Sequence, residues 1–219
     1  MIIAGIDEAG RGPVIGPIVM AIAVIDEKDL PELEKIGVKD SKLITPANRE
    51  RMIGQIKRIC KYEIIAVGPA DIDSAVESET TNLNWLEADV GAKLINNQQK
   101  NGVEKVFVDC PSANPKAYTD YLRQKLSYKP KLVVEHKADY KYLIVGAASI
   151  LAKVTRDHAI EELKKKHNVN FGSGYPADPV TAQFVKDKYD KYDFFRKSWG
   201  TWKTAAKKAE SKQKTLSGF

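Results

Sequence analysis

Short apolar runs alternate with polar, turn-forming segments along most of this 219-residue chain. Five runs have the length and the β-branched or aromatic content of strands. They cover residues 1–6, 14–25, 62–67, 105–109 and 131–135. Between them the apolar spacing changes to that of helices. The predicted helices cover residues 30–36, 46–60, 80–98 and 115–126, with a short one from residue 69 and a long one from residue 139 onward.

The order of these elements predicts an α/β fold. The short link between the first two strands favours an antiparallel hairpin. The strand–helix–strand–helix order of the second half favours parallel neighbours joined by right-handed crossovers. We therefore expect a mixed five-stranded sheet flanked by helices. Residues 168–179 are rich in glycine and proline, which indicates a loop leading to a helical C-terminal segment.

Composition narrows the class of protein. Apolar residues make up 43% of the chain, as in globular proteins, and no apolar run approaches the roughly 20 residues of a membrane span. The N-terminus lacks the pattern of a signal peptide, so we expect a cytoplasmic location. Two cysteines and three histidines show no spacing typical of a disulfide framework or a zinc site. Any metal ion would therefore be held by carboxylates.

Basic residues are concentrated near the C-terminus of a chain whose net charge is +6. Residues 196–214 contain seven lysines and arginines against one acid, with Trp199 and Trp202 among them. Basic side chains interleaved with aromatic ones suit a phosphate backbone. A basic helix face with tryptophans packed beneath it explains the same pattern.

Carboxylates occur where predicted strands end. Asp7 and Glu8 follow the first strand and precede the turn Gly10-Arg11-Gly12. Neighbouring strand residues point to opposite faces, so these two acids can share a site only if the backbone bends there, which the glycines favour. Crowded carboxylates attract Mg²⁺ or Mn²⁺. An exposed acidic turn accounts for this hexapeptide equally well.

Two further acids extend this pattern. Asp109 ends the fourth strand, and Asp139 lies at the start of the helix after the fifth. Ligands of α/β sheets gather beyond the strand ends where the strand order switches, so these acids could converge with Asp7 and Glu8. Four carboxylates suit phosphoryl transfer assisted by two metal ions. Taken singly, each acid has an ordinary explanation as a turn former or a helix cap.

Several ordered motifs resemble one family, type 2 ribonuclease H or ribonuclease HII, above all its archaeal members. The resemblance covers nearly the whole chain. It rests on residues 5–13 with Gly16-Pro17, Asp40-Ser41-Lys42, Asp109, residues 136–139, residues 147–154 and residues 172–176. It implies a ribonuclease H-like sheet with a C-terminal helical segment. It also implies an endonuclease that cleaves RNA in RNA–DNA hybrids and incises 5′ of single ribonucleotides in duplex DNA, leaving 3′-hydroxyl and 5′-phosphate ends.

The resemblance also implies roles for individual residues. Asp7, Glu8, Asp109 and Asp139 correspond to the catalytic acids that bind Mg²⁺ or Mn²⁺. Gly10, Arg11, Gly12 and Tyr175 correspond to the elements that read the ribonucleotide, whose 2′-hydroxyl alone distinguishes it from a deoxyribonucleotide. Ser41, Lys42 and Lys137 are expected phosphate contacts. The chain departs from the family at Leu43, where a second lysine is usual, and after Asp109, where some relatives carry a further acid.

Three parts are expected along the chain: a catalytic core over residues 1–168, a helical substrate-binding segment over residues 169–212 and a tail over residues 213–219. Gln213, Leu216 and Phe219 in the tail have the spacing of a sliding-clamp binding peptide. A frayed terminus is the plainer explanation. The expected partners are a hybrid or ribonucleotide-containing duplex and a sliding clamp, and the protein is expected to be a monomer.

Two other classes of function remain open on the sequence. A nuclease or transposase-like enzyme of the same fold could act on DNA alone, although the Gly10–Gly12 turn and Tyr175 argue against it. A non-catalytic binding module could use the basic surface and the C-terminal peptide. Four acids brought together are a poor design for binding a polyanion without metal.

Overall fold

A five-stranded mixed sheet organises the computed structural model, which describes residues 1–38 and 44–216, with side chains as far as Ser211. Its strand order is β3-β2-β1-β4-β5. Strand β1 is antiparallel to β2 and parallel to β4, and β4 is parallel to β5. The bounds are β1 (Ile2–Ala9), β2 (Ile18–Asp26), β3 (Lys61–Val67), β4 (Lys105–Asp109) and β5 (Lys131–Glu135). The predicted α/β fold with a mixed five-stranded sheet is confirmed.

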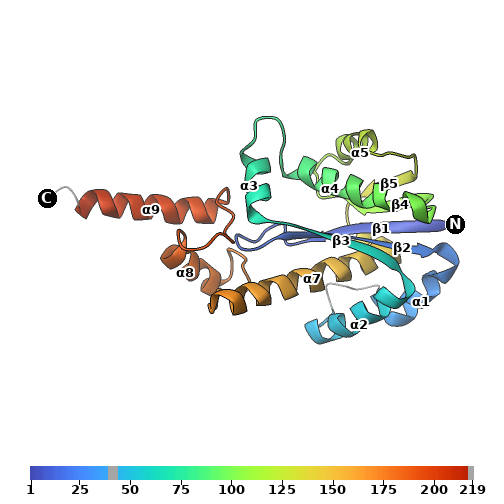
Figure 1. The fold of residues 1–219 in the computed structure, drawn as a ribbon, viewed down its shortest axis with the longest axis horizontal. Helices are drawn as coiled ribbons and strands as arrows, with labels where there is room; N and C mark the ends of the chain where they lie inside the picture. Colours follow the sequence, from blue (N-terminus) through green and yellow to red (C-terminus); the bar gives the residue numbers. More distant parts are fainter. Residues whose placement is uncertain (39–43, 217–219) are drawn as a thin grey trace. The chain divides into compact units, whose positions relative to one another are not determined.

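Helices connect and follow the strands (Figure 1). The α-helices are α1 (Leu30–Ile36), α2 (Pro46–Ile59), α3 (Pro69–Glu77), α4 (Leu83–Asn97), α5 (Pro115–Gln124), α6 (Ala138–Lys141), α7 (Leu143–His167), α8 (Pro179–Lys188) and α9 (Gly200–Leu216). The described residues also include the short 3₁₀ helices η1 (Glu27–Asp29) and η3 (Gln99–Asn101). Thr45 caps α2 as predicted, because its hydroxyl accepts the Asn48 amide N–H at 3.3 Å. Within the described residues no helix is both long and apolar enough to span a bilayer.

Two compact units share the chain. Unit 1 comprises Met1–Ala9, Val19–Ala66 and Leu83–Arg156, and unit 2 comprises Gly10–Ile18, Val67–Asn82 and Asp157–Phe219. This division does not follow the expected boundary at residue 168, because two early segments pack with the C-terminal helices. The roles expected for residues 1–168, 169–212 and 213–219 stay predictions.

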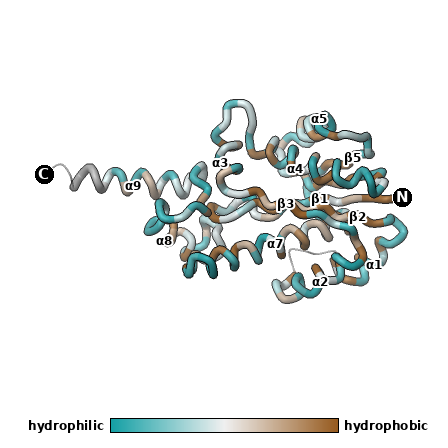
Figure 2. The backbone as a smooth tube through the Cα atoms, in the orientation of Figure 1, coloured by the Kyte–Doolittle hydropathy of each residue, from teal (hydrophilic) through white to brown (hydrophobic). Residues whose placement is uncertain are grey.

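Unit 1 is built around the sheet. In Figure 1, α4 and α5 lie on one side of it, and α1, α2 and the first part of α7 lie on the other. Figure 2 shows the most hydrophobic stretches of backbone in the strands. Every residue of β2 except Asp26 is buried, which explains its continuous apolar run. The core on the α7 side joins Ile3 and Ala9 of β1 to Leu33 of α1 and Ile56 of α2.

Unit 2 has its own aromatic core. Val14, Ile15 and Ile160 pack with Phe171, Val185, Phe194, Phe195 and Ala205. The Tyr192 and Phe194 rings are stacked at 4.7 Å, and Phe171 lies 5.2 Å from Phe194. Aromatic pairs at these separations contribute beyond the area they bury. The C-terminal helices are therefore anchored by aromatic and aliphatic packing.

Some element boundaries differ from the predicted ones. Strand β1 continues to Ala9, because Ala9 pairs with Val19 of β2. Strand β2 begins at Ile18 and not at residue 14. Helix α4 begins at Leu83 and not at residue 80. The predicted long helix from residue 139 is broken at Tyr142, whose backbone is extended.

Candidate active site and nucleic-acid interface

Two of the predicted acids lie at equivalent positions near the ends of neighbouring parallel strands. In the register of β1 and β4, Ile6 lies beside Val108. The next residues are Asp7 and Asp109, so their side chains project from adjacent strands toward the same face. Asp7 is 5% exposed, and Asp109 is partly buried. The predicted meeting of these two acids is thus present in unit 1.

Close packing of helix α7 on strand β1 positions Asp7. A Cβ atom on Gly5 would lie 2.5 Å from the carbonyl carbon of Ile144, so only glycine allows this approach. Asp7 is two residues further along the strand, on the same face, and its carboxylate accepts a hydrogen bond from the Ser149 side chain. Two strand residues span about 6.6 Å. Five helix residues span about 7.5 Å. Because these two lengths are similar, the contact of Gly5 with Ile144 places Ser149 beside Asp7.

Asp7 lies in an environment that disfavours its charge. Burial raises the pKa of its carboxyl well above the usual value, the charge of Glu8 raises it further, and that of Asp109 adds to both. Hydrogen bonds from Ser149 and from the Glu8 amide N–H, the latter at 2.7 Å, oppose these effects. The carboxylates are thus close enough to repel one another.

Asp109 and Asp139 are linked through the start of helix α6. The Ala138 amide N–H donates to Asp109 Oδ1 at 2.8 Å, and the buried Asp139 follows directly. Lys137, the residue before Ala138, has a φ of 58°, which is uncommon for a residue with a side chain. This left-handed residue turns the chain from β5 into α6, and its own side chain is exposed.

The predicted bend between Asp7 and Glu8 is wrong. Both residues belong to β1, paired with Ala21 and Met20, and the chain turns only at Gly10, where φ is 92°. Alternation along the strand directs Asp7 toward the α7 face and Glu8 toward the other. Glu8 still acts on Asp7 through its charge.

The donor set fits a hard divalent cation, since every candidate ligand is a carboxylate and their mutual repulsion favours a positive charge among them. Among residues 1–38 and 44–211, no three Asp, Glu, His or Cys side chains already enclose a metal position. The structure brings Asp7, Glu8 and Asp109 into electrostatic contact and ties Asp109 to the start of α6. The assignment of all four acids as ligands stays a prediction.

The Gly10–Gly12 turn and Tyr175 come together in unit 2. A methyl group placed on Gly12 would lie 3.7 Å from Cε1 and 3.9 Å from Cδ1 of the Tyr175 ring. The Val14 amide N–H donates to the Gly174 carbonyl at 2.9 Å, which ties the turn to the tyrosine loop. Tyr175 is 38% exposed, so it is available to a ligand.

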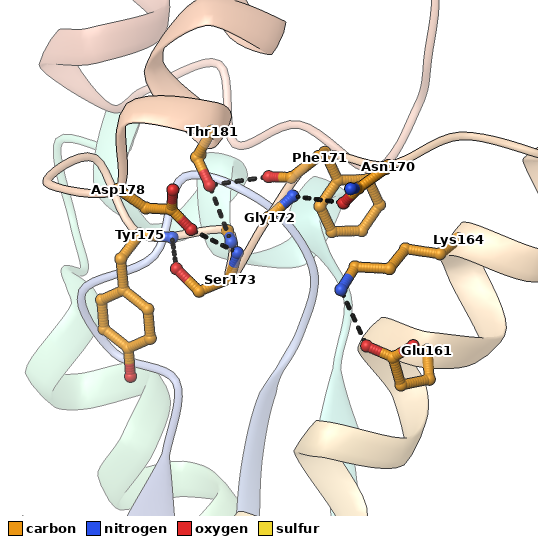
Figure 3. A network of polar contacts seen from close by, with 10 residues as sticks. Glu161, Lys164, Asn170, Phe171, Gly172, Ser173, Tyr175, Asp178 and Thr181 are labelled. Atoms are coloured by element: carbon orange, nitrogen blue, oxygen red, sulfur yellow. Dashed lines mark hydrogen bonds and ion pairs between the residues drawn. The ribbon is translucent and has the colours of Figure 1, made fainter.

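A polar network holds the loop that carries Tyr175 (Figure 3). Thr181 donates to the Phe171 carbonyl at 2.7 Å and accepts the Gly174 amide N–H at 3.0 Å. Asp178 accepts the amide N–H groups of Ser173 at 2.7 Å and Val180 at 2.9 Å. The hydrogen bond from the Ser173 backbone is the largest of the effects that lower the pKa of Asp178 to about 2. In Figure 3 the Tyr175 side chain points away from this network.

The basic C-terminal stretch is not uniformly a charged surface. Arg196 is fully buried, so its expected place on a phosphate-binding face is wrong. Trp199 packs over its guanidinium, with the ring 4.9 Å from Cζ, and the Trp202 indole N–H donates to the Tyr189 carbonyl at 2.8 Å. The tryptophans are thus packed against the core of unit 2. Lys197, Lys203, Lys207 and Lys208 are exposed.

Some predicted residues lie outside the described part of the chain. They are Asp40, Ser41 and Lys42, the side chains of Gln213 and Leu216, and Phe219. Residues that the sequence did not single out for a role include Ser149, which contacts Asp7, and Asp73, which accepts the amide N–H groups of Lys197 and Ser198 at 2.8 Å and 2.9 Å. Ser149 occurs within the 147–154 motif, but its partner depends on the packing of α7.

Comparison with known proteins decides the family. The sequence model described as Ribonuclease HII matches residues 4–202. The chain belongs to the ribonuclease HII family. It is 42% identical to the ribonuclease HII of Pyrococcus horikoshii, over 100% of this chain and 99% of that protein.

Two solved structures of ribonucleases HII agree with this assignment. The crystal structure of ribonuclease H2 from Pyrococcus horikoshii OT3 is 41% identical and has a TM-score of 0.86, covering 96% of this chain and 99% of that one. The PCNA:RNase HII complex from Archaeoglobus fulgidus gives 37% identity and a TM-score of 0.80, covering 92% and 94%. The chain is therefore a ribonuclease H hydrolase, of a family that degrades RNA in RNA–DNA hybrids.

Proposed function

We propose that this ribonuclease HII also incises duplex DNA on the 5′ side of a single embedded ribonucleotide. The products would carry 3′-hydroxyl and 5′-phosphate ends. The observation that carries this proposal is that the Tyr175 ring lies beside Gly12 in unit 2. Gly12 is three residues beyond Ala9, where the acidic strand β1 ends. A turn that reads one ribose would give the enzyme its preference for a single ribonucleotide, and the acids would cut the phosphodiester.

The four acids would perform the hydrolysis with Mg²⁺ or Mn²⁺. Asp7, Asp109 and Asp139 would hold the cations, and Glu8 would add its negative charge from the other face at the end of β1. Ser149 would keep the Asp7 carboxylate aimed by its hydrogen bond. Bound divalent cations supply an activated water and stabilise the leaving oxygen. The Ala138 amide N–H holds one oxygen of Asp109, which fixes the orientation of that carboxylate.

The Gly10–Gly12 turn would recognise the 2′-hydroxyl. Its glycines carry no Cβ, so backbone groups can approach a sugar closely. Tyr175 would lie against the sugar, because its ring already lines the approach to Gly12. Arg11 would belong to the turn that reads the ribonucleotide, and the exposed Lys137 would contact a phosphate. The same roles stay proposed for Ser41 and Lys42.

We further propose that Gln213, Leu216 and Phe219 bind a sliding clamp. The Archaeoglobus fulgidus relative has been solved with PCNA. Helix α9 includes Gln213 and Leu216, so the first part of the peptide is already helical in this chain. One helical turn places Leu216 and Phe219 on one side, where both can enter an apolar pocket.

Cleavage of a labelled DNA duplex containing one ribonucleotide tests the main proposal. The enzyme is assayed with Mg²⁺, with Mn²⁺ and with chelator, beside an all-DNA duplex. We expect one metal-dependent cut 5′ of the ribonucleotide and none in the control. Equal cutting of the all-DNA duplex would refute the proposed recognition of the 2′-hydroxyl. Cutting without a metal ion would refute the proposed metal-dependent hydrolysis.

Matched variants separate the acids from general effects of charge. Asp7→Asn should abolish cleavage, whereas Asp89→Asn makes the same change at an exposed position on α4 and should not.

If binding of the duplex persists while every metal fails to produce cleavage in the unmodified enzyme, the binding-module alternative would stand. Tyr175→Phe should lower discrimination for the ribonucleotide, and indifference to this change would argue against a hydroxyl contact.

The clamp proposal has a separate test. A Leu216→Ala and Phe219→Ala double variant is compared with the unmodified chain for binding to an archaeal sliding clamp by calorimetry. We expect the variant to lose binding, because its two apolar anchors are gone. Equal binding would place the clamp contact elsewhere or remove it.

A further inference from the structure

Buried Arg196 lies beneath the Gly10–Gly12 turn. Its Nη2 donates to the Gly10 carbonyl at 2.7 Å, its Nη1 to the Arg11 carbonyl at 3.0 Å and its Nε to the Gly16 carbonyl at 2.9 Å. The Trp199 indole N–H donates to the Gly12 carbonyl at 3.1 Å. Three successive carbonyls of the turn are thus held by two side chains from one short segment.

The backbone places this segment in register with the turn. Ile15 and Phe195 form an antiparallel bridge, Gly16 N–H donates to the Phe194 carbonyl at 2.9 Å, and Arg196 N–H donates to the Val14 carbonyl at 2.9 Å. Asp73 then holds the next two residues through the amide N–H groups of Lys197 and Ser198. The donors of Arg196 and Trp199 therefore come from a fixed frame.

Holding the carbonyls also directs the amides. The described chain has no cis peptide bonds, and in a trans peptide the C=O and N–H groups point in opposite directions. The Gly10 carbonyl shares its peptide unit with the Arg11 N–H, and the Arg11 carbonyl shares its unit with the Gly12 N–H. Both N–H groups are consequently directed to the side opposite the guanidinium, and two such successive donors form a concavity that suits an oxygen ligand.

We infer that Arg196 and Trp199 are positioning residues that fix the Gly10–Gly12 turn with its amide donors aimed at the ribose of the substrate. This inference rests on the proposed reading of the 2′-hydroxyl by the turn. The charge of Arg196 also polarises the two peptide groups, because their carbonyls accept from a cation. Holding these three carbonyls at once needs the planar donors of a guanidinium, which the single ammonium group of a lysine cannot reproduce.

The chain offers a matched pair of tryptophan variants. Trp199→Phe removes an indole N–H that donates to the turn, and Trp202→Phe removes one that donates to Tyr189 in the same unit. Both phenylalanines retain an aromatic ring in the core. Arg196→Lys keeps the positive charge but loses the planar arrangement of donors on the guanidinium. It is chosen because a larger change at this buried position could prevent folding.

The measurement is discrimination by the intact enzyme between two DNA duplexes. One carries a single ribonucleotide, and the other carries a 2′-fluoro nucleotide at the same position, which lacks the hydroxyl. The ratio of kcat/KM for the two is compared among variants, with melting temperatures measured in parallel. We expect Arg196→Lys to lower this ratio about tenfold, mainly through kcat for the ribonucleotide. Trp199→Phe should lower it less, and Trp202→Phe should keep the original ratio.

The outcomes separate this inference from the proposed function. If the unmodified enzyme cleaves both duplexes equally, the reading of the hydroxyl fails and the positioning role fails with it. If the unmodified enzyme discriminates, but Arg196→Lys and Trp199→Phe retain its ratio, the positioning role alone is overturned. A fall in ratio shared equally by Trp202→Phe, in step with melting temperature, would also overturn it, because the effect would then follow stability.

Discussion

At the scale of single residues, Asp7 shows a conflict between stability and its proposed role. Its side chain is almost fully buried beside two other carboxylates. Moving a charged carboxylate into such a place is unfavourable unless a cation or hydrogen-bond donors compensate. Ser149 supplies part of that compensation. The remainder is what a metal site is expected to supply when it is filled.

Asp7→Asn should therefore raise the melting temperature of the metal-free protein. The pKa of Asp7 is raised in the folded state, so its favourable contribution is present below the unfolded pKa and is lost as pH rises through the folded pKa. Above the unfolded pKa this difference in pKa destabilises the fold, whether the buried carboxyl is protonated or charged there, and the amide removes the titrating group. Thermal melts at pH 7 with chelator check this, with Asp89→Asn as reference.

Metal addition completes this test. Mg²⁺ should raise the melting temperature of the unmodified protein more than that of Asp7→Asn, because a ligand stabilises the state that binds it. A lower melting temperature for Asp7→Asn with chelator would contradict the assigned electrostatics. An equal response of both proteins to Mg²⁺ would contradict the place of Asp7 in the metal site.

At the scale of elements, the α7–β1 contact determines whether the acids are presented correctly. Backbone atoms of Ile144 and Val145 lie where a Cβ of residue 5 would be, at 2.5 Å and 2.6 Å. Gly5→Ala must separate the helix from the strand, and overpacking of this kind costs about 3 kcal/mol. Activity should fall further than the loss of folded protein explains, because Ser149 would move away from Asp7. Urea unfolding and initial rates on the folded fraction measure the two effects.

Gly54→Ala provides the control for this prediction. Gly54 lies within α2, and an added Cβ would meet only Arg58 Nη2, at 4.0 Å. Alanine is the better helix former, so this variant should gain about 0.5–1 kcal/mol. If Gly5→Ala were as stable as Gly54→Ala, the close approach of α7 would be refuted.

The loop before α8 has a pH dependence of its own. Hydrogen bonds from Ser173 and from the first residues of α8 lower the pKa of Asp178 to about 2. A lowered pKa contributes stability that is present above the unfolded pKa, near 4, and is lost as pH falls toward 2. The difference in melting temperature between the unmodified protein and Asp178→Asn should therefore shrink between pH 5 and pH 2. A difference that stayed constant over this range would contradict the ionised cap.

How far the sequence predicts these elements depends on where their signals lie. Local signals predicted α1, β4 and β5 at their observed bounds and the Thr45 cap of α2. Strand β1 was predicted too short, because its last residues are strand only through pairing with β2. The role of Arg196 was hidden, since a buried arginine and a surface arginine look alike in a basic run. The close approach at Gly5 likewise depends on α7, which is some 140 residues away in sequence.

At the scale of the whole molecule, the chain passes between the two units after Ala9, Ile18, Ala66, Asn82 and Arg156. Neither unit is therefore a continuous stretch of sequence. The core of unit 2 shows the consequence most directly. Val14, Ile15 and Ile160 come from the first 168 residues, whereas Phe171, Val185, Phe194, Phe195 and Ala205 come from later ones. The turn that follows β1 is thus completed by residues near the other end of the chain.

A chain cut after residue 168 should not behave as an independent catalytic core. Removal of Phe171, Phe194 and Phe195 exposes Val14 and Ile15, and each aliphatic side chain loses about 1.5–3 kcal/mol of burial. The Gly10–Gly12 turn also loses the Arg196 and Trp199 donors. We expect the truncated chain to aggregate or to melt at a much lower temperature than a chain ending at Ser211, which retains all of these partners. Calorimetry of the two proteins tests this prediction. A cooperative transition of residues 1–168 at the melting temperature of the longer chain would contradict it, because residues 1–168 would then fold without the C-terminal helices.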